Sequence, residues 1–211
     1  MELSQANFFN LNFMKELVFA TNNQHKVEEI TFALGGLFQV ISLREAGINI
    51  DIPEPHQTLE ENATEKSMTI YRLTGKDCFS EDTGLEVEAL NGEPGVHSAR
   101  YAGEDKAFDK NIDKLLTKLG QETNRRARFR TVISLIWEGR ELFFEGICEG
   151  AITRERHGAG GFGYDPVFIP AGHTRTFAEM PLEEKNLISH RRQAADKLVS
   201  FLQNQVKVLK D

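Results

Sequence analysis

Two long strand-like runs in the second half of the chain constrain its fold more than any other feature. They cover residues 127–137 and 141–153, and the tripeptide Glu138-Gly139-Arg140 separates them. Runs of this length joined by so short a glycine-containing turn are typical of a β-hairpin. The sequence therefore predicts two long antiparallel strands, around which the other elements must be arranged.

Helical and strand patterns flank this hairpin on both sides. Further strands are predicted at 16–21, 38–43, 77–81 and 85–90, with a turn at Asp82-Thr83-Gly84 between the last two. Helices are predicted from residue 26 to the Gly35-Gly36 pair, and at 62–73, 106–119 and 189–205, the last capped by Ser189. This order predicts an α/β fold: an elongated mixed β-sheet flanked by helices, with two lobes and a central cleft. We expect residues 1–15 to be an N-terminal extension and residues 16–211 to form one two-lobed domain.

The net charge of the chain limits its partners. At −7 over 211 residues it argues against broad nucleic-acid binding, because affinity for duplexes comes largely from neutralising phosphates. A nucleotide substrate needs only a few local cations and stays compatible with this charge. The sequence has no apolar run of membrane length, and its two cysteines, Cys78 and Cys148, lie far apart. We therefore expect reduced core thiols in a cytoplasmic protein with no membrane partner.

The most informative motif for function is GGFGYDPVF at 160–168. Its glycines let the backbone approach a ligand, and its aromatic rings suit a planar base. The segment EKNLISHR at 184–191 follows closely and adds a lysine, a histidine and an arginine. Together the two segments predict a pocket for a flat, polar, anionic ligand such as a nucleotide. The alternative for the first segment, taken alone, is a turn between strands.

Two further motifs carry charges that suit phosphate chemistry. The first, TNNQHK at 21–26, lies between a strand and a helix, where free backbone amides bind phosphate and Lys26 adds a full charge. The alternative to phosphate binding is that asparagine only caps the helix and that Lys26 is solvated. The second is the acidic pair Glu81-Asp82, in which one carboxylate can hold Mg²⁺ or act as a general base while the other orients water. Its alternative is an acidic surface turn.

Three cations and one acid complete the set of candidate residues. His190 and Arg191 follow the predicted cap, and a cation at a helix start opposes the helix dipole. Such a local conflict often marks a functional site, and an oxygen at purine position six or a phosphate would resolve it. A solvated basic first turn is the alternative. Lys66 in the helix 62–73 could reach a phosphate. Glu54 in the preceding loop does not by itself indicate a function.

Five motifs occur in one order along the chain: TNNQHK, EENATEK, SEDTGLEVEALNGEPGVHSARYAG, GGFGYDPVF and EKNLISHR. With them the sequence resembles the inosine triphosphate pyrophosphatase family, from about Leu17 to Leu202. Several long motifs in order are much more specific than any one of them. The resemblance implies hydrolysis of the non-standard purine nucleotides dITP, ITP and XTP to a nucleoside monophosphate and pyrophosphate. It also implies a need for Mg²⁺ and a homodimer.

The resemblance assigns the first motifs to the triphosphate. The phosphates would be cradled by Thr21, Asn22, Asn23, Gln24, His25 and Lys26, with Lys66 approaching them. Asp82 would be the catalytic carboxylate and a metal ligand, with Glu81 beside it, although many relatives carry two Asp at this point. Glu54 is the candidate for a second metal ligand, in the stretch that matches the family least closely. Water activated by Asp82 and the metal would attack between the α- and β-phosphates.

The resemblance assigns the later motifs to the base. The pocket would be formed by Phe162, Gly163, Tyr164 and Asp165, with Phe162 stacking on the purine. The polar edge of the base would be read by Lys185, His190 and Arg191, and Thr83 would contact the substrate.

Two other functions stay open. One is a Maf-like pyrophosphatase acting on other nucleotides. Maf-like proteins carry a Ser-Pro-Arg-Arg type first loop, so the Thr-Asn-Asn loop of this chain, with Lys26, counts against that reading. The other is a non-catalytic nucleotide sensor, which loss of the acidic pair would favour; Glu81 and Asp82 are both present.

Overall fold

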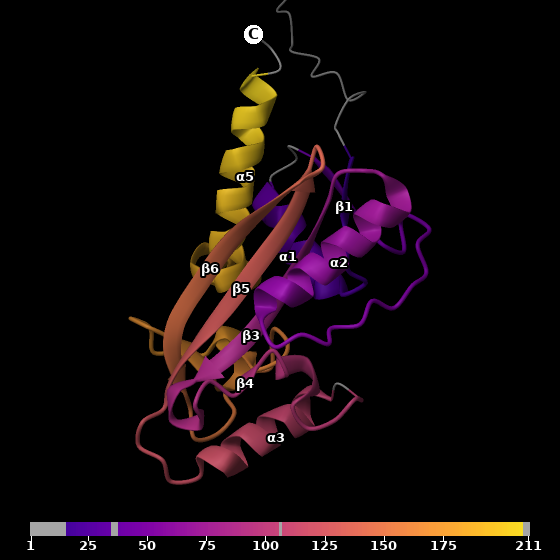
Figure 1. Cartoon of the computed structure of the whole chain (residues 1–211). Coiled ribbons are helices and arrows are strands. Elements are labelled where there is room, and N and C mark those ends of the chain that lie inside the picture. Colours follow the sequence, from indigo (N-terminus) through magenta and orange to yellow (C-terminus); the bar gives the residue numbers. More distant parts are fainter. Residues whose placement is uncertain (1–15, 35–37, 106, 209–211) are drawn as a thin grey trace, which may run out of the picture.

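One mixed β-sheet runs through the structure, a computed structural model that describes residues 16–34, 38–105 and 107–208 (Figure 1). Within these residues its strands are β1 (Glu16–Phe19), β2 (Gln39–Ser42), β3 (Cys78–Val87), β4 (Pro94–Gly95), β5 (Arg126–Trp137), β6 (Arg140–Ile152) and β7 (Phe168–Pro170). Their order is β2-β1-β3-β5-β6-β7, with β4 paired to β3. β1 runs parallel to β2 and β3, and the other pairs are antiparallel. The predicted mixed α/β fold is confirmed.

β5 and β6 form the long hairpin that the sequence predicts. They pair from Arg126, opposite Ala151, to Trp137, opposite Arg140. The two residues between them, Glu138 and Gly139, have φ angles of 49° and 76°. Two successive left-handed residues give the tight turn whose twist matches that of the strands, which explains the glycine.

Helices cover both faces of the sheet (Figure 1). They are α1 (Gln24–Leu34), α2 (Leu59–Thr74), α3 (Phe108–Leu119), α4 (Leu182–Ile188) and α5 (His190–Val208). α2 packs on β3 and β5, where the hydroxyls of Ser67 and Ser134 lie 2.6 Å apart. α1 and α5 pack on the other face, over Ile133 and Leu135. No helix in the described part of the chain has both the length and the apolar character needed to cross a membrane.

Two apolar clusters occupy different ends of the long strands. In β3, Phe79 belongs to the cluster under α1 and α5, whereas Leu85 belongs to a cluster beside α3. In β5, Ile133 belongs to the cluster under α1 and α5, and Phe129 belongs to the cluster beside α3. This arrangement fits the predicted two lobes. The division into one two-lobed domain stays a prediction, and the predicted extension at 1–15 lies outside the described residues.

β3 corrects one prediction. The expected turn at Asp82-Thr83-Gly84 is wrong, because β3 continues through these residues and pairs with β5 throughout. A glycine is needed at residue 84 because β4 lies so close to it. A Cβ atom on Gly84 would lie 2.7 Å from the carbonyl oxygen of Gly95 in β4. The glycine therefore permits close approach of a neighbouring strand and does not mark a reversal of the chain.

Helix boundaries differ from the sequence pattern where a cap decides them. α2 begins at Leu59, three residues before the predicted start, because the Thr58 hydroxyl accepts a hydrogen bond from the Glu61 amide at 3.2 Å. The predicted cap of the last helix is confirmed, since the Ser189 hydroxyl accepts a hydrogen bond from the Arg192 amide at 3.1 Å. The predicted stop at 35–36 and the predicted start at residue 106 lie outside the described residues.

Gly146 in β6 sets the position of the last helix. A Cβ atom on Gly146 would lie 2.0 Å from the carbonyl oxygen of His190 and 2.5 Å from the amide nitrogen of Ala194. The first turn of α5 therefore rests directly on the β6 backbone. This contact brings His190 and Arg191 against the centre of the sheet.

Candidate active site

The loop between β1 and α1 is folded by its own polar side chains. The Thr21 hydroxyl accepts a hydrogen bond from the Asn23 amide at 3.1 Å, and the Asn23 side chain caps the helix by accepting one from the Lys26 amide at 3.3 Å. Capping by asparagine is thus confirmed. A solvated Lys26 is wrong, because its ammonium lies 3.1 Å from a carboxylate oxygen of Glu81 and its side chain is 18% exposed.

The two adjacent carboxylates of β3 face opposite sides of the sheet. Successive side chains of a strand alternate between its faces. Glu81 points to the side of α1 and α5, where it meets Lys26 and Arg191. Asp82 points to the side of α2, where it meets Lys66. The continuous strand thus gives the two acids separate environments.

Asp82 shares a cation with Glu54. The Lys66 ammonium lies 2.9 Å from Asp82 Oδ1 and 2.5 Å from Glu54 Oε1. Asn62 donates a hydrogen bond to the other oxygen of Asp82 at 3.4 Å, and an Arg100 nitrogen lies 3.5 Å from Glu54 Oε2. The loop that carries Glu54 is therefore brought to the catalytic candidate by opposite charges.

The pKa values of these acids move in opposite directions. Burial raises the pKa of Asp82, and the Lys66 ammonium only partly offsets it. Burial also acts to raise the pKa of Glu54, but Lys66, Lys26 and Arg100 outweigh it and lower that pKa to about 2. Glu54 is therefore a fixed anion at neutral pH, whereas Asp82 holds a proton more strongly than an ordinary aspartate and is the better proton acceptor.

A buried ion-pair cluster occupies the other side of β3. Arg191 Nε lies 2.8 Å from a Glu81 oxygen, and its guanidinium also pairs with Glu29. Lys185 lies 3.0 Å from Glu29 and 2.8 Å from Asp165. Burial alone acts to raise the pKa of Glu81, yet Arg191 and Lys26 lower it to about 2. Ion pairs thus join α1, β3, α4 and α5 to the loop that carries Asp165.

The loop of GGFGYDPVF is held around Asp165. The Asp165 carboxylate accepts a hydrogen bond from the Phe162 amide at 2.8 Å. A Cβ atom on Gly161 would lie 2.0 Å from an oxygen of the same carboxylate, so this glycine makes room for the bond. Tyr164 is fixed as well, because its hydroxyl donates a hydrogen bond to the Ser98 carbonyl at 2.9 Å.

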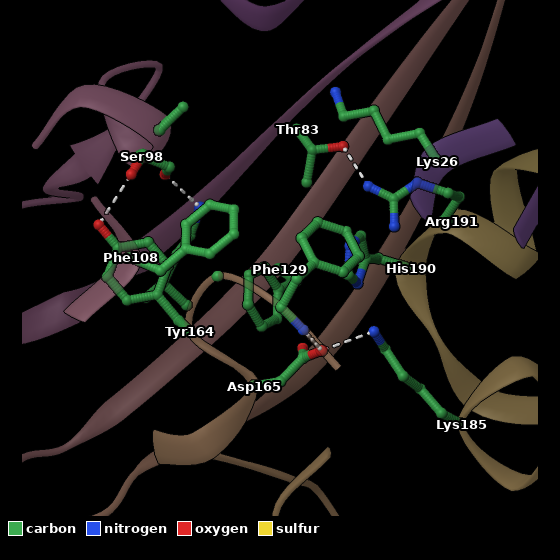
Figure 2. A pocket seen from close by; sticks show the side chains of 14 residues that line it. Lys26, Thr83, Ser98, Phe108, Phe129, Tyr164, Asp165, Lys185, His190 and Arg191 are labelled. Carbon is green, nitrogen blue, oxygen red and sulfur yellow. Dashed lines mark hydrogen bonds and ion pairs between the residues drawn. The ribbon is translucent and has the colours of Figure 1, made fainter. Parts of the chain in front are cut away.

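A cleft lies between this loop, the sheet and the start of α5 (Figure 2). It is lined by Lys26, Thr83, Leu85, Ser98, Ala99, Phe108, Phe129, Phe162, Gly163, Tyr164, Asp165, Lys185, His190 and Arg191. Two cations lie over the Phe162 ring, with Lys185 Nζ 4.9 Å and Arg191 Cζ 5.5 Å from the ring centroid. We refer to this hollow as the aromatic cleft.

His190 is neutral and has an unused nitrogen. Its ring stacks on Phe129, with centroids 4.6 Å apart and planes 17° apart. Burial, and then the neighbouring Arg191, Lys185 and Lys26, lowers the pKa of His190 well below its usual range. Its buried Nδ1 has no hydrogen-bond partner among the described residues. A buried polar atom left unpaired is costly, and His190 lines the aromatic cleft, so a ligand bound there is a candidate partner for this nitrogen.

A second, polar hollow lies beside the first. It is lined by Ala20, Thr21, Asn22, Asn23, Lys26, Leu43, Ile50, Asp51, Ile52 and Lys66. Lys26 lines both hollows, so the two adjoin at this residue. One ligand with a flat ring at one end and an anionic chain at the other can therefore occupy both.

The structure brings most predicted site residues to these two hollows, but not all. The predicted residues that line neither are Gln24, His25, Glu54, Glu81 and Asp82. The three acids contact the lining lysines: Glu54 and Asp82 contact Lys66, and Glu81 contacts Lys26. His25 stacks on Phe162 with ring centroids 5.1 Å apart, and a phosphate role for Gln24 and His25 stays a prediction. Sequence reasoning missed Glu29 and Asn62, although Glu29 follows Lys26 by three residues and therefore shares its helix face.

The donor set fits a magnesium ion. No group of three or more His, Cys, Asp or Glu side chains that could hold a metal occurs within the described ranges. Mg²⁺, however, is usually held by one or two carboxylates together with substrate phosphates and water. Glu54 and Asp82, which converge on one ammonium beside the polar hollow, provide that pair.

Comparison with known proteins identifies the family. The family model of the Ham1 family matches residues 17–201. The chain belongs to the Ham1 family. This result confirms the resemblance to the inosine triphosphate pyrophosphatases.

Relatives match over nearly their whole length. The chain is 53% identical to a Porphyromonas gingivalis protein named dITP/XTP pyrophosphatase, over 90% of this chain and 98% of that protein. It is 44% identical to a Staphylococcus aureus protein of the same name, over 90% and 97% of the two chains. Among solved structures, the Ham1 protein of Staphylococcus aureus matches with a TM-score of 0.83 at 43% identity, over 90% of this chain and all of that one. A HAM1 protein from Coxiella burnetii matches with a TM-score of 0.84 at 38% identity, over 90% and 100%.

The ion-pair cluster predicts a large stability difference between two adjacent glutamates of α1. Glu29→Ala leaves Arg191 and Lys185 with one carboxylate fewer in a buried site, and we expect a loss of about 3 kcal/mol in the free energy of unfolding. Glu28 is exposed, so Glu28→Ala should stay within about 0.5 kcal/mol of the parent. Urea unfolding at pH 7, followed by circular dichroism, measures both. Equal effects of the two substitutions would show that the cluster does not hold these elements together.

Proposed function

We propose that this protein hydrolyses non-standard purine nucleoside triphosphates, namely dITP, ITP and XTP, to the nucleoside monophosphate and pyrophosphate. The observation that carries the proposal is the position of Lys26, which lines both the aromatic cleft and the polar hollow. The base would occupy the first and the phosphates the second. The names of the relatives, dITP/XTP pyrophosphatase, support the same reaction.

The phosphates would meet cations and amides. The free amides at the start of α1 favour an anion, and Lys26 and Lys66 border the same hollow. Both lysines already contact carboxylates, Glu81 and Asp82 respectively. A triphosphate entering the hollow would compete for these ammonium groups and so place its bridging oxygens beside Asp82.

Asp82 would act as the general base for the attacking water. Its raised pKa favours proton uptake, and the bonds from Asn62 and Lys66 fix the direction of its oxygens. The water would attack between the α- and β-phosphates, and pyrophosphate would leave. Glu54 and Asp82 would hold Mg²⁺ together with phosphate oxygens, and the bound ion would neutralise charge on the triphosphate. Positioning and charge neutralisation provide most of the catalysis in such transfers.

Base choice would depend on His190 more than on Arg191. The guanidinium of Arg191 is already engaged by Glu81 and Glu29, whereas Nδ1 of His190 is unpaired. A neutral imidazole can donate one hydrogen bond, which an oxygen at purine position six accepts and an adenine amino group does not. A site built to pair an oxygen rejects a base that leaves the donor unpaired.

The first prediction of this proposal concerns substrate and product. With Mg²⁺, a panel of dITP, XTP, dATP, dGTP and dUTP should release pyrophosphate from dITP and XTP in preference to dATP, and EDTA should stop the reaction. The products are separated by ion-exchange chromatography. Orthophosphate as the sole primary product would contradict the mechanism, and preferred turnover of dUTP would support a Maf-like function. Binding without turnover would support a sensor.

The second prediction concerns Asp82. Asp82→Asn removes the proton acceptor and a metal ligand, so kcat for dITP should fall about 10²-fold or more. Asp196→Asn, on the exposed side of α5, is the matched control and should keep the parent rate. Circular dichroism checks that both variants fold. Near-normal turnover in Asp82→Asn would show that another group is the general base, and Glu81 would be the first candidate.

We further propose a homodimer that acts in the cytoplasm. The dimer rests on the resemblance, with the loop 91–103 as a candidate contact, and the location is supported by two free, buried thiols, Cys78 and Cys148. Light scattering at micromolar concentration should give twice the chain mass of 23.8 kDa. A mass equal to that of one chain would contradict the dimer.

A further inference from the structure

The apolar face of α3 continues beyond the core into the aromatic cleft. Ile112, Leu115 and Leu119 are at most 2% exposed and pack in the cluster beside this helix. Phe108 precedes them by four, seven and eleven residues, so it lies on the same face of the helix. Its side chain, however, is 42% exposed and lines the cleft. The core therefore does not account for this aromatic residue.

Phe108 stands opposite the polar wall of the cleft. Figure 2 shows it across the pocket from His190 and Arg191, which come from α5. Its ring lies near that of Phe162, with centroids 6.2 Å apart and planes 49° apart. The two rings come from different segments, the first turn of α3 and the loop after β6. The two rings thus lie beside each other in the lining of one opening. The Phe162 ring is covered in part by His25, Lys185 and Arg191, whereas the Phe108 ring stays exposed.

From this placement we propose that Phe108 contacts the base of the bound nucleotide and is a second aromatic residue, beside Phe162, in the wall of the base site. The inference rests on the proposed function, because it takes the aromatic cleft as the base site. A purine that presents its polar edge to His190 can turn one face toward Phe108 across the cleft. It would then cover the exposed part of the Phe108 ring, and stacking on an aromatic side chain stabilises any base, whichever hydrogen bonds it makes.

A base contact of this kind acts on binding and not on the chemical step. Phe108→Ala should raise KM for dITP about 5- to 100-fold, the usual size of one base–aromatic stack, with kcat little changed. The dissociation constant for dIMP, measured by calorimetry, should rise by a similar factor. Phe108→Trp keeps an aromatic face and should stay close to the parent in both measurements.

Phe143 provides the matched control. It is the same residue type with a similar exposure, 48%, and lies in β6 away from the cleft. Phe143→Ala should leave KM for dITP and the affinity for dIMP unchanged. A general effect of losing an exposed phenyl ring would appear in both alanine variants, whereas loss of a base contact appears only in Phe108→Ala.

The outcomes separate this inference from the proposed function. If the parent hydrolyses dITP and Phe108→Ala keeps the parent KM and dIMP affinity, the Phe108 contact is wrong and the function stands. If the parent binds dIMP through Phe108 but does not hydrolyse dITP, the function is wrong and the Phe108 contact stands. If the parent neither hydrolyses dITP nor binds dIMP, both are overturned.

Discussion

The buried pairing of Arg191 with Glu81 and Glu29 is the interaction on which the site depends most. These three residues come from α5, β3 and α1, and each is at most 5% exposed. A charge in such a place is tolerated only with partners, and removing a partner leaves the other charge unpaired. The same cluster continues through Lys185 to Asp165, which holds the Phe162 loop. One network of charges therefore joins α1, the central strand β3 and the loop that carries Phe162.

The central strand β3 places its two acids in different environments. Glu81 faces Arg191 and Lys26, and its pKa falls to about 2, so it is a permanent anion that orders the cations around it. Asp82 faces Lys66 on the other side, and burial raises its pKa. Neighbouring titratable groups whose environments separate their pKa values often divide structural and proton-transfer roles. The alternation of a strand is sufficient to produce this division.

Much of the fold could be predicted because it follows from local patterns. The β5–β6 hairpin and the Ser189 cap depend on short-range chemistry that the sequence shows directly. The turn expected at 82–84 was wrong because Gly84 is explained by a contact with Gly95 in β4, which no local pattern reveals. Glu29 was missed for a similar reason: its partners, Lys185 and Arg191, lie more than 150 residues away in the chain. Long-range pairing decides both features.

The central claim is that one nucleotide spans both hollows across Lys26, and a crystal structure of the complex tests it most directly. The protein would be crystallised with Mg²⁺ and a dITP analogue whose α–β bridging oxygen is replaced by an NH group. The account predicts the base in the aromatic cleft, with its six-oxygen toward His190, and the phosphates along residues 21–26 with the α–β bridge facing Asp82. A base in the polar hollow, or phosphates in the aromatic cleft, would contradict it.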